Sequence, residues 1–128
     1  MHLGLGFFTP ENPRAGVPRH LWFALSDPGR SDRVVLANVS TKRCTSGEVC
    51  VVAPKEHEKV SAESYLRFDE VRVSPRADLD RLFESGTLQA TTDASPELLR
   101  KLQRAILESI AVPLEAKDLL RNQGLPGA

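Results

Sequence analysis

The first half of the chain alternates short apolar runs with segments rich in turn-forming residues. Apolar residues dominate residues 21–26, 33–40 and 48–53. The turn sequence Asp27-Pro28-Gly29 separates the first two of these runs. Short apolar runs bounded by turn residues are typical of buried strands. Residues 3–8, which include two glycines, fit a strand with a bend. The pattern therefore predicts a series of short strands.

Two segments interrupt this pattern. Residues 9–18 are rich in Pro and Gly and predict a long loop, whose length indicates a functional role. In residues 64–73, apolar and polar positions alternate in two halves that are out of phase. We expect a β-bulge near Asp69 and Glu70, because an extra residue there restores one apolar face and bends the sheet.

Helical spacing replaces this alternation in the last part of the chain. Residues 78–85 predict a short helix with Asp78 as N-cap and Gly86 as its stop. Ser95-Pro96 supplies an N-cap and a first-turn proline for a second helix, and residues 114–122 predict a third. The second helix carries apolar residues at helical spacing: Leu98, Leu99, Leu102, Ile106 and Ile110.

Short strands followed by helices indicate the fold class. We predict an α+β domain in which a small antiparallel β-barrel is followed by C-terminal helices. The 128 residues suit one domain and are too few for two ordinary ones. We therefore expect a single domain over 1–128, with the barrel and a short helix over about 1–92 and the C-terminal helices over about 93–128.

Composition and charge narrow the function classes. No apolar run approaches the roughly 20 residues needed to span a bilayer, and the N-terminus does not read as a signal peptide. We therefore expect a cytoplasmic protein with no membrane partner. The formal net charge is zero, which gives no overall attraction to nucleic acid. Six basic and three acidic residues precede residue 44, however, so a local basic face is expected.

The two cysteines, Cys44 and Cys50, flank a turn-like sequence and could face each other across two strands. Such pairs usually remain thiols in a reducing cytosol. Their spacing matches no common zinc motif. We expect structural thiols, with a disulfide or a metal site as weaker alternatives, and we predict no metal and no cofactor.

Three segments resemble the MazF/PemK (Kid-type) toxins of type II toxin–antitoxin systems. Residues 19–26 are similar to the family's Arg-Pro-(apolar run)-Ser strand, and residues 33–41 to its later strand that ends in Ala-Pro-Ile-Thr-Ser. Residues 64–73 resemble its Ser-x-x-x-x-Asp-Gln-(Ile/Leu)-Arg-Thr strand. The resemblance covers residues 3–110 in the same order. It implies an SH3-like barrel of the CcdB/PemK/MazF type, a homodimer and a cognate antitoxin protein.

The resemblance also implies a metal-independent endoribonuclease that cleaves single-stranded RNA. In such chemistry the ribose 2′-hydroxyl attacks the adjacent phosphate and leaves a cyclic phosphate and a 5′-hydroxyl. The site needs a fixed guanidinium for the charged phosphorane and groups that move or orient two protons. It also needs access to unpaired bases, because sequence-selective RNA contacts mostly use single strands.

The resemblance assigns roles to individual residues. Arg19 falls on the family's catalytic Arg and Ser40 on its catalytic Thr, and Thr41 takes that role if the register is shifted by one residue. The expected substrate-binding residues are His20, Asn38, Asp69 and Arg72.

Several positions depart from the family pattern or have a plainer explanation. His20 and Asn38 stand where the family has Pro, and Glu70 stands where it has Gln, which places a negative charge near the expected phosphate. Arg19 could instead pair with a nearby Asp. His20 and His57 are both candidates for acid–base work, and Trp22 is expected in the core or at a dimer contact.

Three functions therefore stay open. The first is the endoribonuclease, and the second is a binder that grips a protein target, as the related gyrase-poisoning CcdB toxins do. The third is a non-catalytic regulatory module. An apolar face on residues 114–120 beyond what the core needs would favour a protein partner.

Overall fold

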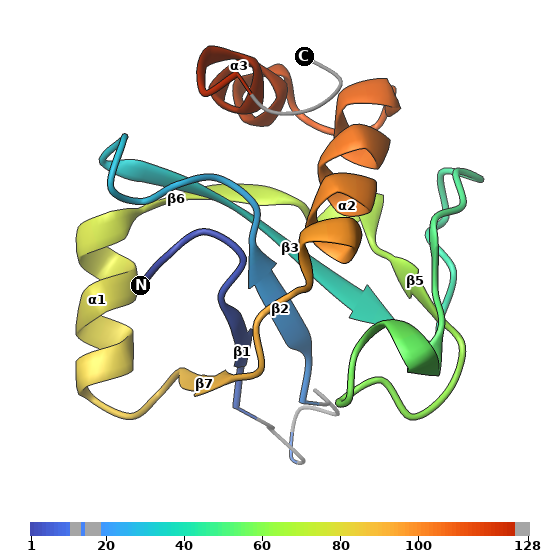
Figure 1. Cartoon of the computed structure of the whole chain (residues 1–128), viewed down its shortest axis with the longest axis horizontal. Helices are drawn as coiled ribbons and strands as arrows, with labels where there is room; N and C mark the ends of the chain where they lie inside the picture. The colour runs from blue at the N-terminus through green and yellow to red at the C-terminus, as the bar shows by residue number, and fades with distance from the viewer. Residues whose placement is uncertain (11–13, 15–18, 125–128) are drawn as a thin grey trace.

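An antiparallel sheet is arranged around β3 (Arg33–Ser40), its longest strand. The computed structural model describes residues 1–10, 14 and 19–124 (Figure 1). Most of the loop expected over 9–18, and the end of the chain after Gly124, lie outside the described residues. The sheet has the order β4–β5–β3–β2–β1–β7, and β6 also pairs with β3. The remaining strands are β1 (Gly6–Phe8), β2 (Leu21–Ala24), β4 (Val51–Val52), β5 (Ser64–Leu66), β6 (Arg72–Pro75) and β7 (Gln89–Thr91).

Strand β3 has the predicted bounds because it is buried on both faces. All of its residues from 34 to 39 are buried, as expected of a near-continuous apolar run. It pairs with β2 along one edge, with Leu21 opposite Val39. Along the other edge it pairs with β6 near its start and with β5 near its end. The single polar residue inside this buried run is Asn38.

The β-bulge expected near Asp69 and Glu70 is wrong. The 3₁₀ turn η3 (Phe68–Glu70) instead divides the segment into two separate strands, β5 and β6. The turn corrects the phase between the two halves, so that Phe68 and Val71 are both buried. A 3₁₀ turn, and not an inserted residue, therefore restores the phase of the apolar positions between the two halves.

The expected barrel is also not closed. Within the described residues, β4 and β7 form the two edges of the sheet and do not pair with each other. Strand β7 pairs with β1 and lies between the first two predicted helices, where the sequence pattern predicts no strand. A side chain on Gly6 would collide with the backbone carbonyl of Thr92, so this glycine lets the backbone of β1 approach the segment after β7 closely.

Three helices follow or interrupt the strands. Helix α1 (Arg76–Glu84) begins after Pro75 rather than at Asp78, which lies inside the first turn. Helix α2 (Pro96–Glu108) has the predicted Ser95 cap, whose hydroxyl accepts a hydrogen bond from the Leu98 backbone N–H at 3.1 Å. Helix α3 (Leu114–Asn122) has its predicted bounds. None of the helices in the described part of the chain has the length and apolar character needed to cross a bilayer.

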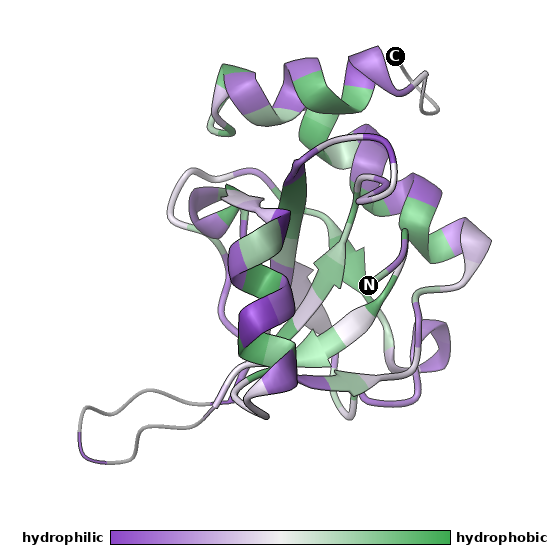
Figure 2. Ribbon diagram, turned by 90° about the vertical axis from the view of Figure 1, so that its left-hand side faces the viewer, coloured by the Kyte–Doolittle hydropathy of each residue, from purple (hydrophilic) through white to green (hydrophobic). Residues whose placement is uncertain are grey.

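The sheet carries a hydrophobic core on each face. Leu102, Ile106 and Leu120 of α2 and α3 pack on one face, where they meet Phe23 and Val35. Leu79 of α1 covers the other face together with Phe7, Trp22, Val34, Leu36 and Leu88. Figure 2 shows hydrophobic strands lying between α1 and α2. The stripe predicted on the second helix extends too far, because Ile110 lies beyond the end of α2 and is 92% exposed.

Glu48 links the loop before β4 to the corner between α2 and α3. Its carboxylate accepts hydrogen bonds from the Ser109 hydroxyl at 2.6 Å and from the backbone N–H groups of Ile110 and Ala111 at 3.2 and 3.3 Å. Burial raises the pKa of Glu48, but these hydrogen bonds outweigh it, so that its pKa lies below the usual value.

Replacing Glu48 with glutamine is therefore expected to lower the free energy of unfolding by about 1 kcal/mol at neutral pH. Since the pKa of Glu48 is lower in the folded chain than in the unfolded chain, its carboxylate contributes stability above the unfolded value. That contribution is lost as the pH falls through the lowered value. Urea titrations of both proteins between neutral pH and pH 3 test this, and a difference that does not shrink on acidification would contradict it.

Candidate functional site

A cleft of about 620 Å³ lies where the start of β2 meets the end of β3. The two strands are antiparallel, with Leu21 opposite Val39, so the residues just before β2 lie beside those just after β3. Arg19, His20, Ser40 and Thr41, which the sequence placed in two separate segments, all line this cleft. Its remaining walls include Phe8, Lys42, Lys59, Val60, Ser61, Ala62, Arg67 and Glu70.

The exposed side chain of Arg19 is held against an aromatic ring in the cleft. Its guanidinium carbon lies 3.7 Å from the centroid of the Phe8 ring, a cation–π contact that orients the group and leaves its N–H donors available. No ion pair joins Arg19 to an acidic side chain among the described residues. The plainer explanation for Arg19, a pair with a nearby Asp, is therefore not found there.

Arg67, which the sequence reasoning did not single out, forms one wall of the cleft. It donates hydrogen bonds to both carboxylate oxygens of Asp69, at 3.2 and 3.1 Å, and its Nη2 lies 3.3 Å from Glu70 Oε2. The hydrogen bond from Arg67 is the main reason that the pKa of Asp69 lies below its usual range. The only sequence signal for Arg67 was its polar position between two buried residues of the 64–73 segment.

Asn38 lies beneath the cleft rather than in its wall. Its side chain is fully buried, and its amide Nδ2 donates a hydrogen bond to Glu70 Oε1 at 2.7 Å. Glu70 is thus held from two directions, by the Asn38 amide and by the Arg67 guanidinium. Neither Asn38 nor Asp69 lines the cleft: Asn38 is buried and holds Glu70, and the exposed Asp69 pairs with Arg67.

Arg72 is not brought together with the other candidate residues. Its backbone pairs with Leu36, and its guanidinium carbon lies 5.0 Å from the centroid of the Trp22 ring. Trp22 belongs to the hydrophobic core that α1 covers. The sequence-derived set therefore divides into four cleft residues, two supporting residues and one arginine outside the cleft.

His57 has a structural role in the described chain. Its Nε2 lies 2.7 Å from the carbonyl oxygen of Thr92, and its Nδ1 accepts a hydrogen bond from the backbone N–H of Lys59 at 3.1 Å. The ring is buried and packs edge-on against Phe23. Because both ring nitrogens are engaged, the acid–base candidate that remains in the cleft is His20.

The charges of the cleft favour an anionic ligand. Arg67 and Glu70 pair with each other, which leaves Arg19, Lys42 and Lys59 without ion pairs among the described residues. These three cations come from separate segments of the chain. Lys42 follows the end of β3 directly, whereas Lys59 was not singled out in the sequence because only the fold brings the 57–63 loop beside the end of β3.

Both cysteines are buried free thiols, as expected of structural cysteines. The Cys44 thiol donates a hydrogen bond to Asp69 Oδ1 at 3.3 Å and lies 3.2 Å from the Ser46 hydroxyl. Burial raises the pKa of the Cys50 thiol. Cys44 therefore helps to fix Asp69, the partner of Arg67.

The arrangement of strands and helices matches a known structure. The chain superimposes on a chain of the crystal structure of MazE–MazF (form III) from Deinococcus radiodurans with a TM-score of 0.55 and 12% sequence identity. The match covers 88% of this chain and 98% of that chain. No family model matches the sequence, and no curated protein matches it. The likeness concerns the fold: the chain is an α+β protein with a MazF-like fold.

Proposed function

We propose that this protein is a metal-independent endoribonuclease of the toxin type, acting on single-stranded RNA. The observation that carries the proposal is the convergence of Arg19, His20 and Ser40 in one cleft. The charged side chains of this cleft that make no ion pair among the described residues are all cations. Such a cleft suits a chain of phosphates, because each cation offsets one backbone charge. The MazF-like fold of the chain supports the same function.

In the proposed reaction, a base takes the proton of the ribose 2′-hydroxyl and the 2′-oxygen attacks the adjacent phosphorus. The bond from phosphorus to the 5′-oxygen then breaks, and an acid returns a proton to that oxygen. The products are a 2′,3′-cyclic phosphate and a 5′-hydroxyl. We assign the base to Glu70, held by Asn38 and Arg67, and the acid to His20.

We assign to Arg19 the stabilisation of the negative charge that develops on the phosphorane. Its planar guanidinium can donate two parallel hydrogen bonds to the non-bridging oxygens. Ser40 adds a hydroxyl donor from the end of β3, and Lys42 and Lys59 would bind the flanking phosphates. These groups are already in position before substrate binds, which is the condition under which electrostatic stabilisation is most effective.

We further propose that the protein works in the cytoplasm as a homodimer and is held inactive by an antitoxin protein. The similar crystal structure is of MazE–MazF. The antitoxin is the natural partner for a ribonuclease that would otherwise damage its own cell.

The direct test is incubation of the purified protein with a long single-stranded RNA in excess EDTA. We expect fragments with cyclic-phosphate and 5′-hydroxyl ends, identified by mass spectrometry. A duplex of the same sequence is the control and should remain intact, since its bases are not accessible. Intact single-stranded RNA across several substrates, from a protein with a folded circular dichroism spectrum, would overturn the proposal.

Two single substitutions decide which hydroxyl assists. Ser40→Ala is expected to lower the rate of cleavage by about 10- to 100-fold, the effect of losing one hydrogen bond of about 1–3 kcal/mol. Thr41→Ala should change it much less, because β3 ends at Ser40 and Thr41 is exposed. Single-turnover rates on a short fluorescent RNA measure both. A larger loss for Thr41→Ala would instead assign the role to Thr41.

A second candidate function is supported by the corner between α2 and α3. Ile110 is 92% exposed and Leu114 is 66% exposed, more apolar surface than the core of the described chain requires. Such a surface favours a toxin that grips a protein target. In that case Arg19→Ala would not alter the activity, whereas Ile110→Asp would reduce binding to the target.

A further inference from the structure

Tyr65 places an aromatic ring at the border of the cleft, and the reaction described above makes no use of it. Tyr65 lies on β5 directly opposite Ser40 of β3. The side chains of two directly opposed residues lie on the same face of a sheet, with their Cβ atoms about 4.5–5.5 Å apart. Ser40, Ser64 and Arg67 all line the cleft. The ring therefore stands beside the hydroxyl that we assign to the reaction.

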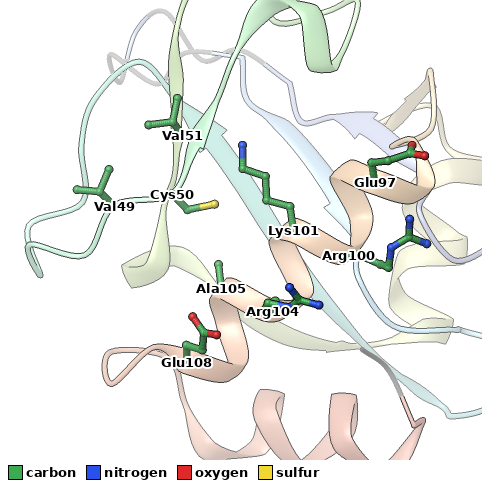
Figure 3. A pocket seen from close by; sticks show the side chains of 9 residues that line it. All are labelled: Val49, Cys50, Val51, Glu97, Arg100, Lys101, Arg104, Ala105 and Glu108. Atoms are coloured by element: carbon green, nitrogen blue, oxygen red, sulfur yellow. The ribbon is translucent and has the colours of Figure 1, made fainter. Parts of the chain in front are cut away.

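The ring of Tyr65 is not part of the packed interior. Its neighbours Ser64 and Leu66 are buried, whereas Tyr65 itself is half-buried, because successive side chains of a strand point to opposite faces. Tyr65 belongs to neither hydrophobic core. Val51, its partner on β4, points away from α2 (Figure 3), and Figure 1 shows α1 and β5 at opposite ends of the sheet. Neither α1 nor α2 therefore covers the face that carries Tyr65.

An arginine lies over this ring. The guanidinium carbon of Arg43 is 5.1 Å from the centroid of the Tyr65 ring. Arg43 is exposed and makes no ion pair among the described residues. The Tyr65 hydroxyl donates a hydrogen bond to Glu63 at 2.9 Å, which engages the edge of the ring rather than its faces. A cation–π pair with a free guanidinium thus lies next to the cationic cleft.

A flat ring and a flat guanidinium suit a nucleobase. Unpaired bases stack on aromatic rings and on arginine planes, and every base has a π-face for such a contact. Strand β5 is only about 4.8 Å from β3, the spacing of neighbouring strands. A strand of RNA whose phosphate lies at Arg19 and Ser40 therefore brings the base of an adjoining nucleotide beside Tyr65.

We propose that Tyr65 and Arg43 form a stacking site for one unpaired base of the RNA in the cleft. The inference rests on the proposed function in taking RNA as the ligand. It adds a base contact to a cleft whose assigned groups all act on the phosphates and the ribose. Because Arg43 is not held by an acidic side chain, it can move aside and close over the base. A base held in this way has left the stack of a duplex, so the site selects single strands.

The test uses a fluorescein-labelled heptamer of 2′-O-methyladenosine, which lacks the attacking hydroxyl and cannot be cleaved. Fluorescence anisotropy measures its Kd for the full chain. Tyr65→Leu is expected to weaken binding about tenfold or more, the usual effect of losing one stacked base, whereas Tyr65→Phe keeps the ring and should bind within about twofold of wild type. All three proteins should show the same slope of log Kd against log salt, because the ring contacts no phosphate.

A matched heptamer of abasic 2′-O-methylribose phosphates separates a base contact from support of the cleft wall. It has the same charge and no bases, so wild type and Tyr65→Leu should bind it equally. Arg43→Ala should weaken binding of the adenosine heptamer more than that of the abasic heptamer. Arg100→Ala, which removes an exposed arginine of α2 outside the cleft, is the control and should change neither.

Equal binding of the adenosine heptamer by wild type and Tyr65→Leu would overturn the proposal, and so would absence of binding by wild type. An equal loss on the abasic heptamer would also overturn it and would make Tyr65 a support of the cleft wall. Cleavage of unmodified RNA is measured separately. Base-dependent binding without cleavage would remove only the ribonuclease, whereas cleavage together with unchanged binding by Tyr65→Leu would remove only the stacking site.

Discussion

Replacing Arg19 with alanine is expected to lower RNA cleavage by about 10²- to 10³-fold, the usual effect of removing one donor that stabilises transition-state charge. Arg19 is exposed and its described contact is with the Phe8 ring, so the fold should persist. Arg19→Lys should recover only part of the rate, because an ammonium keeps the charge but cannot form two parallel hydrogen bonds. Single-turnover kinetics with a fluorescent RNA measure all three proteins.

The matched control is Arg81→Ala on α1, an exposed arginine that pairs with Asp78 and lies outside the cleft. It should cleave RNA at the wild-type rate. Equal rates for wild type and Arg19→Ala, with both proteins folded, would contradict the assignment of Arg19. A rise in KM with kcat unchanged, measured under multiple-turnover conditions, would assign Arg19 to substrate binding rather than to the transition state.

Replacing Leu102 with alanine is expected to lower the free energy of unfolding by about 2–5 kcal/mol, because it opens a cavity in a packed core. Leu102 lies in the middle of α2 with no exposed surface, within the core that joins α2 and α3 to the sheet. Urea or thermal unfolding followed by circular dichroism measures the change. Since a small domain has only about 5–15 kcal/mol of stability, the variant is expected to have a smaller folded population at 37 °C than the wild type.

Ile110→Ala removes a side chain of the same size from the same predicted apolar stripe and serves as the control. Ile110 is 92% exposed, so its loss should change stability by less than about 0.5 kcal/mol. Similar losses for the two variants would mean that the corner between α2 and α3 is covered in solution, for example by a second copy of the chain. Sedimentation at several concentrations distinguishes that case.

Elements with strong local signals were predicted from the sequence almost residue by residue. The serine cap and the following proline define the start of α2, because they satisfy the first free N–H groups of a helix. Helix α3 and strand β3 also have their predicted bounds. In each case the signals that mark the start and the end of the element lie within the element or directly beside it in the sequence.

Elements that depend on distant partners were not predicted. Strand β7 has no buried residue, so no alternation marks it, and its hydrogen bonds come from β1 far away in the chain. Either a bulge or the η3 turn could bring the apolar positions of the two halves of residues 64–73 into phase. The structure has the turn, because β5 and β6 pair with opposite ends of β3. The open edge at β4 likewise follows from the whole sheet.

By itself, the sequence determined the α+β order of elements, the helices and the four candidate residues that line the cleft. These four lie at the adjoining ends of two strands, so antiparallel pairing alone brings them together. Three facts depend on the folded arrangement: Asn38 is buried beneath Glu70, Arg67 and Lys59 join the cleft, and Arg72 lies outside it. The reason is physical: which face a side chain occupies, and which loop covers it, depends on contacts between residues far apart in the chain.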